Sequence, residues 1–171
     1  MNIKQALENE HSKTLTTAIV NYIGQDKARF KELVDIFLKG EYRLTQRAAW
    51  PLSYASIEEP ALVKPYIGRL IKKLKEPGQH PAIPRNILRL FQEIDIPEKY
   101  QAELLDECFR IIQTPTLPTA SVAFAISTAA SLCRPFAELR QELLLLLNHL
   151  NSYPQTAAIK VRVKKAMKDL S

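Results

Sequence analysis

The prolines of this 171-residue chain fall into two interleaved series that share one period. The first series, with spacings of 37 and 38 residues, is Pro60, Pro97 and Pro135; the second, with spacings of 37 and 36, is Pro81, Pro118 and Pro154. Each proline precedes or opens a stretch with the apolar spacing of a helix. Proline suits the first turn of a helix because its missing N–H has no intrahelical partner there. The shared period therefore predicts a repeated helix pair, which at this length is typical of an α-solenoid.

Apolar residues follow a helical period along the whole chain, and no stretch shows the alternation of a β-strand. We therefore predict an all-α protein with a single domain over residues 1–171. Gly24 and Gly40 are predicted helix stops, and Asp26 is a predicted N-cap. Pro51 and Pro65 fall inside predicted helices, whose axes they should bend. The predicted organisation is an N-terminal helix within residues 1–25 followed by four helix pairs at about 26–57, 60–94, 97–133 and 135–170.

The composition limits the location of the protein and its chemistry. The segment from Met1 to Gln5 has no apolar signal-peptide region, and no stretch approaches the length of a membrane-spanning helix. Cys108 and Cys133 lie in apolar helical stretches, which predicts two buried free thiols and a reducing, cytoplasmic location. The net charge of +6 permits an acidic partner without requiring one.

Aligning the second helix of each predicted pair brings one residue from each into a column: Arg47, Arg85, Val122 and Lys160. Over residues 26–170 the chain resembles the HEAT repeat family, in which the second helix begins with a basic residue ahead of an alanine- and leucine-rich run. The sequence Gln46-Arg47-Ala48-Ala49-Trp50 carries the resemblance best, and Pro84-Arg85-Asn86-Ile87-Leu88 carries it fairly well. It also resembles a group of short bacterial HEAT-like proteins. The resemblance implies a right-handed α-α superhelix.

In a HEAT stack the second helices line the concave face, so the basic column has two interpretations. Arg47, Arg85 and Lys160, with Arg89 and Lys164 one turn on, would form a positive stripe for a phosphate backbone. The alternative, which we favour, is that Arg47 and Arg85 bond a neighbouring repeat and hold the stack together.

Two further groups also have two interpretations each. Trp50 and Tyr54 lie one turn apart beside Arg47, where they would stack on a base or else fill space between repeats. The C-terminal basic run would dock on an anion or form the solvated face of a capping helix. That run consists of Lys160, Arg162, Lys164, Lys165 and Lys168.

The sequence offers no catalytic constellation. DNA glycosylases built from HEAT-like repeats need a carboxylate on a concave-face helix, and the predicted helix over 43–57 contains no acid. His11, His80 and His149 lack the spacing of metal ligands, and His80 is expected at the surface or as a helix cap. The clustered acids Glu103, Asp106 and Glu107 are expected on a solvated outer face. No cofactor and no metal is predicted.

These observations predict a non-catalytic interaction or scaffold module that binds a protein or peptide, without a membrane or small-molecule partner. The alternative is a nucleic-acid-binding protein that uses a basic concave face and its C-terminal helix. The candidate binding surface for either partner consists of Arg47, Trp50, Tyr54, Arg85, Arg89, Lys160, Arg162, Lys164 and Lys165.

Overall fold

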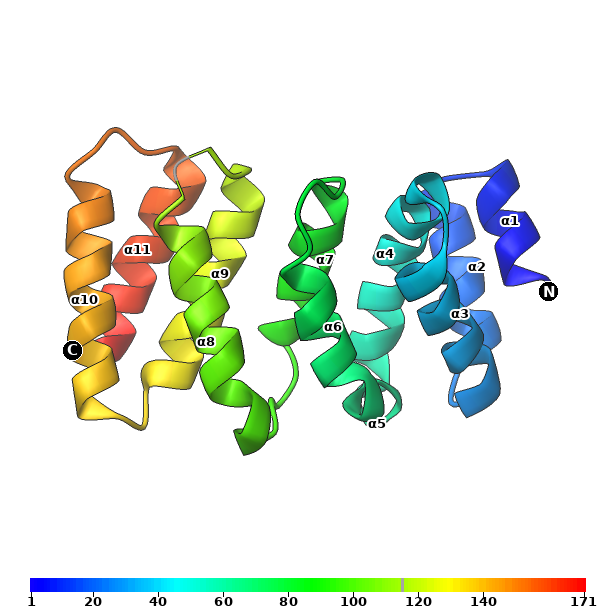
Figure 1. Ribbon diagram of the computed structural model, residues 1–171, viewed down its shortest axis with the longest axis horizontal. Helices are drawn as coiled ribbons and strands as arrows, with labels where there is room; N and C mark the ends of the chain where they lie inside the picture. Colours follow the sequence, from blue (N-terminus) through cyan, green and yellow to red (C-terminus); the bar gives the residue numbers. More distant parts are fainter. Residues whose placement is uncertain (115) are drawn as a thin grey trace. The chain divides into compact units, whose positions relative to one another are not determined.

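The computed structural model describes residues 1–114 and 116–171. These residues form helices joined by turns, and no strand occurs among them (Figure 1). The prediction of an all-α protein is confirmed over this part of the chain. The helices divide into two compact units, residues 1–95 and 96–171. The predicted superhelix and single domain stay predictions.

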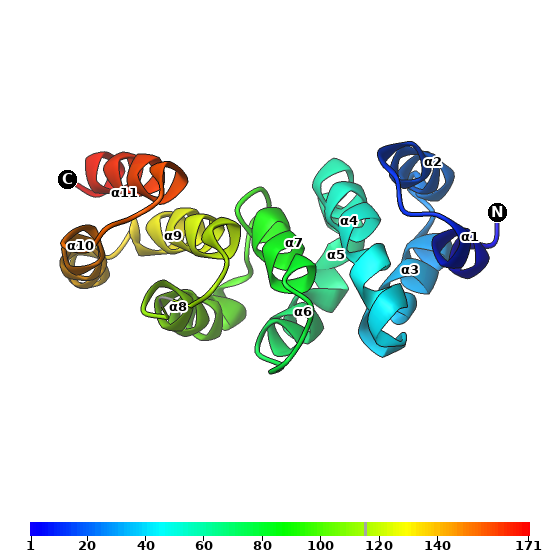
Figure 2. The same cartoon turned by 90° about the horizontal axis from the view of Figure 1, so that it is seen from above.

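Unit 1 is built from two layers of helices. Seen from above, α2, α4 and α7 lie in one layer, and α1, α3 and α6 lie in the other (Figure 2). Helix α4 packs against α2, α3 and α7 and so forms the centre of the unit. The elements of unit 1 are α1 (Ile3–Asn9), α2 (Lys13–Ile23), α3 (Lys27–Lys39), α4 (Tyr42–Glu58), α5 (Pro60–Val63), the 3-10 turn η1 (Lys64–Tyr66), α6 (Ile67–Leu74) and α7 (Ala82–Phe91).

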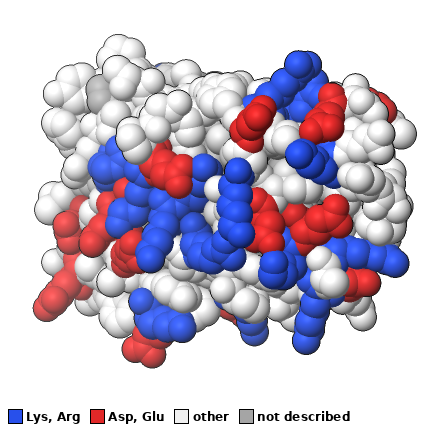
Figure 3. All heavy atoms as spheres, turned by 45° about the vertical axis from the view of Figure 1, so that its right-hand side comes forward, with Lys and Arg blue, Asp and Glu red and all other residues white. Residues whose placement is uncertain are grey.

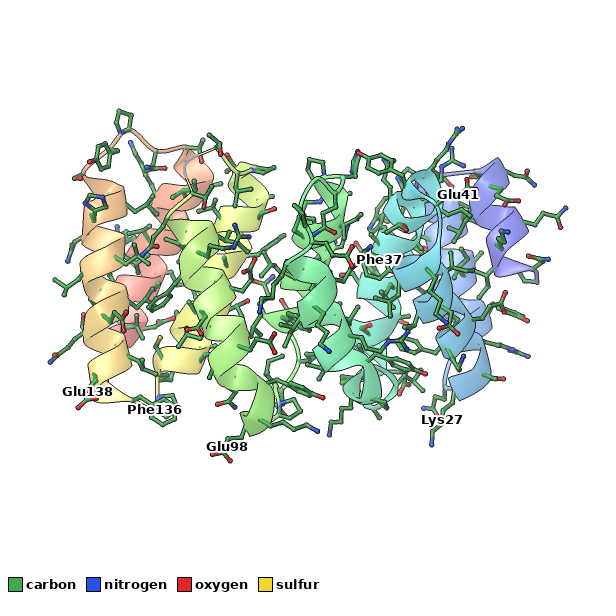
Figure 4. All side chains as sticks on the ribbon, viewed as in Figure 1. Lys27, Phe37, Glu41, Glu98, Phe136 and Glu138 are labelled. Atoms are coloured by element: carbon green, nitrogen blue, oxygen red, sulfur yellow. The ribbon has the colours of Figure 1, made fainter. Side chains whose placement is uncertain are left out.

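Unit 2 repeats the two-layer arrangement with four helices, α8 (Glu98–Ile112), α9 (Thr119–Cys133), α10 (Ala137–Asn151) and α11 (Ala157–Leu170). Helix α9 packs against α8, α10 and α11. Figure 4 shows Glu98 and Glu138, near the first residues of α8 and α10, at the same edge of the unit. Helices α8 and α10, which form one layer of unit 2 (Figure 2), therefore run in the same direction.

The helix boundaries follow the capping residues that the sequence indicates. Pro60 is the first residue of α5, and prolines directly precede α7, α8 and α9. Asp26 Oδ1 accepts the N–H groups of Ala28 and Arg29 at 2.8 and 3.0 Å, so it is the N-cap of α3 as predicted. Gly24 ends α2 with a φ of 48°, a conformation that favours glycine.

The two prolines predicted to lie within helices have different effects. Pro51 lies inside α4, which continues through it from Tyr42 to Glu58. Pro65 lies in the 3-10 turn η1, which divides the first helix of the pair predicted over 60–94 into α5 and α6. The division follows from proline chemistry, because Pro65 has no N–H to donate to the preceding turn.

The N-terminal region contains two helices, where the sequence predicts one. Ser12 has an extended backbone, and its hydroxyl accepts the N–H of Leu15 at 3.0 Å. A new helix therefore starts after Ser12, and the chain reverses before it. The additional helix α1 has its own N-cap, Asn2, and buries Ile3 and Leu7 in the core of unit 1.

The expectation of a solvated acidic face on α8 is wrong for one residue. Asp106 is exposed, but the Glu107 side chain is only 4% exposed. The Arg110 guanidinium donates to both oxygens of the Glu107 carboxylate, and the Nε to Oε2 distance is 2.9 Å. This bidentate ion pair supplies the counter-charge that a buried carboxylate needs.

Both thiols are buried and free, as the sequence predicts. Burial raises the pKa of Cys108, and it raises the pKa of Cys133 to about 11. The thiolate is the reactive form of cysteine, so these groups are poor nucleophiles near neutral pH. They serve as small core residues of α8 and α9.

Candidate functional site

Five of the predicted binding residues lie in unit 1, on two helices of one layer. Arg47, Trp50 and Tyr54 are three and four residues apart on α4 and so share one face of it. Arg85 and Arg89 are one turn apart on α7, which packs against α4. Packing of α4 on α7 thus gathers residues that are about 40 positions apart in the sequence.

Arg89, Tyr54 and Trp50 contact one another in that order along this face, and we call these three side chains the ladder. The Arg89 guanidinium carbon lies 4.4 Å from the centroid of the Tyr54 ring, within the range of a cation–π contact. The Tyr54 and Trp50 ring centroids are 6.3 Å apart, and the Trp50 and His11 centroids are 5.9 Å apart, both edge to face. Hydrogen bonding from Arg89 and then from Trp50 lowers the pKa of the Tyr54 hydroxyl. The Trp50 and Tyr54 rings are therefore held by their neighbours while they stay half-buried, and His11 is exposed.

A shallow pocket of about 40 Å³ lies between α2 and α4 beside the ladder. Trp50 and Tyr54 line it together with Lys13, the first residue of α2, and Glu58 at the end of α4. We call the set of Lys13, Arg47, Trp50, Tyr54, Arg85 and Arg89 the cation–aromatic face. Its aromatic part offers a small apolar recess, with positive charge from three helices around it.

The two arginines of the predicted column have different roles. Arg47 Nη1 donates to the carbonyl oxygens of Leu7 and Glu8 at 2.7 and 2.8 Å. These are carbonyls at the C-terminal end of α1, which lack intrahelical partners. Arg47 thus joins α4 to α1, as the favoured interpretation of the column expects. Arg85 is exposed, and no described residue forms an ion pair or hydrogen bond with its side chain.

We expect Arg47→Ala to lower the free energy of unfolding by about 1–3 kcal/mol, because two carbonyls lose a charged donor. The loss should be local, so amide hydrogen exchange should accelerate in α1 and stay unchanged in α9. Hydrogen exchange with mass spectrometry measures both regions in one sample. Arg85→Ala is the matched control, since its side chain has no bond to lose. Equal acceleration of α1 in the two variants would contradict the role of Arg47.

Two histidines, His11 and His80, lie near Arg47 and Arg85. Burial, followed by the positive charges of Arg47, Arg85 and His80, lowers the pKa of His11. His80, expected at the surface or as a helix cap, lies just before Pro81, the N-cap of α7, and its Nδ1 accepts the N–H of Ala82 at 3.1 Å. Sequence reasoning missed His11, because it lies between two helices outside any helical period.

The remaining predicted site residues lie in unit 2, on α11. Arg162 Nη1 donates to the Ser127 hydroxyl at 3.0 Å, and its guanidinium carbon lies 5.8 Å from the Phe124 ring centroid. Arg162 is therefore packed on α9. Lys160, Lys164 and Lys165 are exposed, and within the described residues none of them forms an ion pair. They form a solvated face of α11, opposite the face that packs on α9.

Unit 2 also contains a larger surface cavity of about 510 Å³, where the ends of α8 to α11 meet. Leu117, Val122 and Leu146 contribute apolar surface to it, and His149 and Tyr153 lie at 5.3 Å between ring centroids. None of its described lining residues is Asp, Glu, Lys or Arg. A charged ligand would therefore find no counter-charge in this cavity.

Two kinds of site are absent from the part of the chain that the structure describes. No group of three His, Cys, Asp or Glu side chains comes together in a way that would hold a metal ion. Among the helices of residues 1–114 and 116–171, none combines the length and the apolar character that crossing a membrane requires.

A family model for the HEAT repeat domain matches residues 3–170. HEAT repeat domains generally serve as protein-interaction scaffolds and are typically non-catalytic. Searches of curated proteins and of solved structures find no match to this chain.

Proposed function

This chain belongs to the HEAT repeat domain family, and we propose that it is a non-catalytic module that binds a partner protein on the cation–aromatic face. One observation carries the proposal: Trp50, Tyr54 and Arg89 form a contiguous, half-buried ladder on α4 and α7. Tryptophan, tyrosine and arginine are the residue types that dominate the binding energy of protein interfaces.

The geometry of the ladder favours binding in a second way. Association costs free energy when mobile side chains must be ordered at the interface. Here the Tyr54 ring already contacts Arg89 and Trp50, and the His11 and Trp50 rings meet edge to face. These side chains are therefore already ordered in the free protein, and less free energy is lost in ordering them when a partner binds.

The charges favour a protein partner over the nucleic-acid alternative. Tight binding to a phosphate backbone uses several free cations, commonly about six to ten contacts. In unit 1 the Arg47 guanidinium is bonded to α1 and that of Arg89 lies on Tyr54. Lys13 and Arg85 are the residues of the face that remain exposed with no ion pair among the described residues. With two exposed cations and two arginines already held within the protein, the face offers fewer cations than a phosphate track of about six to ten contacts uses.

Site-specific photocrosslinking in a lysate of the cells that make the protein tests this proposal. A benzophenone side chain replaces Lys13, at the edge of the recess, or Lys72, which is exposed on α6 in the other layer. We expect an adduct from position 13 that protease removes and nuclease does not, and no matching adduct from position 72. Trp50→Ala should reduce the yield of the adduct from position 13 at least about tenfold. A nuclease-sensitive adduct, or equal adducts from both positions, would refute the proposal.

A further inference from the structure

We infer that the partner presents an acidic, extended peptide segment to the cation–aromatic face, with carboxylates toward Arg85 and Arg47 and an apolar side chain at the recess between Trp50 and Tyr54. This inference rests on the proposed function, because it names the chemistry of the partner at the same face. Three features of the cation–aromatic face support this partner: its unpaired cations, its contrast with the other layer of unit 1, and its length.

Positive charge on this face has no negative partner. No described residue forms an ion pair with Lys13, Arg47, Arg85 or Arg89. The carbonyls of Leu7 and Glu8 that bind Arg47 orient its guanidinium but carry no net charge. Carboxylates brought to this face would therefore gain attraction without first breaking an ion pair of the free protein.

The other layer of unit 1 shows the opposite arrangement. Lys31, Lys39 and Arg69, from α3 and α6, all lie within 4.0 Å of the carboxylate of Asp35. Figure 3, which shows one side of the molecule, has Asp and Glu side chains beside Lys and Arg, and also a patch of adjoining Lys and Arg left of centre. Cations around Asp35 thus have a carboxylate that offsets part of their charge, whereas no described residue forms an ion pair with the cations of the cation–aromatic face.

His11 lies close to the cations of the cation–aromatic face. It is approached by Arg47 from α4 and by Arg85 and His80 from α7 and the turn before it. The neighbouring carboxylate of Glu10 accepts a hydrogen bond from Ser12, and Lys13 adds a further positive charge to this segment. Burial and then the nearby cations lower the pKa of His11 in the free protein, and a bound carboxylate should raise it.

The layer of α2, α4 and α7 limits the length of the bound segment and indicates which end of it carries the apolar residue. Neighbouring packed helices lie about 8–10 Å apart, so three helices span about 20 Å, the length of about six to eight extended residues. Glu58 lines the recess beside Trp50 and Tyr54. An acidic side chain is disfavoured there, so the apolar residue of the segment belongs at that end.

The first experiment is a binding titration with defined probes. Trp50 is the single tryptophan of the chain, so its fluorescence reports on this face alone. The probes are a peptide of about eight residues with four Glu followed by Leu, the same peptide with Gln for Glu, and a single-stranded DNA of about the same length. We expect the Glu peptide to bind at least about tenfold more tightly than the Gln peptide at about 50 mM salt, and more weakly at about 200 mM.

Matched variants locate the binding site. Arg85→Glu should weaken binding of the Glu peptide at least about tenfold, because it replaces an attractive charge with a repulsive one. Lys72→Glu makes the same charge change at an exposed residue of α6 and should change the affinity less than about twofold. Neither residue is buried, so both variants should fold. Equal losses in the two variants would overturn the inference.

An NMR titration of the His11 ring in the presence and absence of the Glu peptide gives an independent readout. We expect the peptide to raise the pKa of His11, and an unchanged pKa in the saturated complex would contradict the inference. If the Glu peptide fails to bind while position 13 still yields a protein adduct, the acidic partner is wrong and the proposed function stands. If the DNA binds more tightly than the peptide, both are wrong.

Discussion

Phe37→Ala is expected to lower the free energy of unfolding by about 3–5 kcal/mol. Phe37 lies on α3, which packs against α4, and its side chain is 0% exposed (Figure 4). Removing the ring loses its transfer free energy and leaves a cavity that the surrounding helices fill only in part. A loss of this size is a large fraction of the stability of an ordinary domain. Chemical denaturation followed by Trp50 fluorescence measures it within unit 1.

Phe136→Ala provides the matched control for this prediction. Phe136 precedes α10 and is 50% exposed, so the same truncation removes a ring that is already half in water. We expect it to cost less than about 1 kcal/mol, and circular dichroism follows its unfolding because Phe136 lies in unit 2 and Trp50 lies in unit 1. A cost for Phe37→Ala no larger than that for Phe136→Ala would contradict the burial of Phe37 in the core.

Arg110→Ala is expected to lower the free energy of unfolding by about 2–3 kcal/mol. It leaves the buried carboxylate of Glu107 without its bidentate partner, and an uncompensated buried charge is strongly destabilising. The expected loss lies below the range for fully buried pairs, because the Arg110 side chain is itself largely exposed. Denaturation followed by circular dichroism measures the change.

A second substitution separates charge burial from lost packing. In the Arg110→Ala background, Glu107→Gln removes the unpaired charge at nearly constant volume and should recover about 1–2 kcal/mol. In the wild-type background the same change should destabilise, since it weakens the ion pair. A double-mutant cycle over the four proteins gives the coupling. A double variant no more stable than Arg110→Ala would show that packing, and not charge, explains the loss.

The helix boundaries are the part of the fold that local sequence predicts best. Prolines precede α7, α8 and α9 and restrict the backbone at the start of each helix. Asp26 accepts hydrogen bonds from residues two and three positions further along the chain. Their effects depend on a few adjacent positions, so a pattern in the sequence is enough to predict them. The sequence also contains a local indication that a new helix begins after residue 12, because Ser12 is an N-cap residue that precedes the apolar stripe beginning at Leu15.

The candidate site was predictable in part. The repeat period places Arg47 and Arg85 at equivalent positions, and α4 and α7 indeed pack side by side. The period does not predict that Arg47 is bonded to α1 while Arg85 is exposed without a partner in the described chain. The contact of His11 with Trp50 joins residues 39 positions apart, one of them in a turn. No local pattern indicates such a pair.

By itself the sequence determined the all-α class, the repeated helix pairs and the residue types of the candidate site, because helical period, proline position and capping act over a single turn or repeat. Tertiary structure alone decided which charges are paired. Glu107 is buried and paired with the exposed Arg110, Asp35 forms ion pairs with cations from α3 and α6, and Arg85 has no partner among the described residues. The physical reason is that burial and charge pairing depend on which helix faces come together, and several packings satisfy the same periodic pattern.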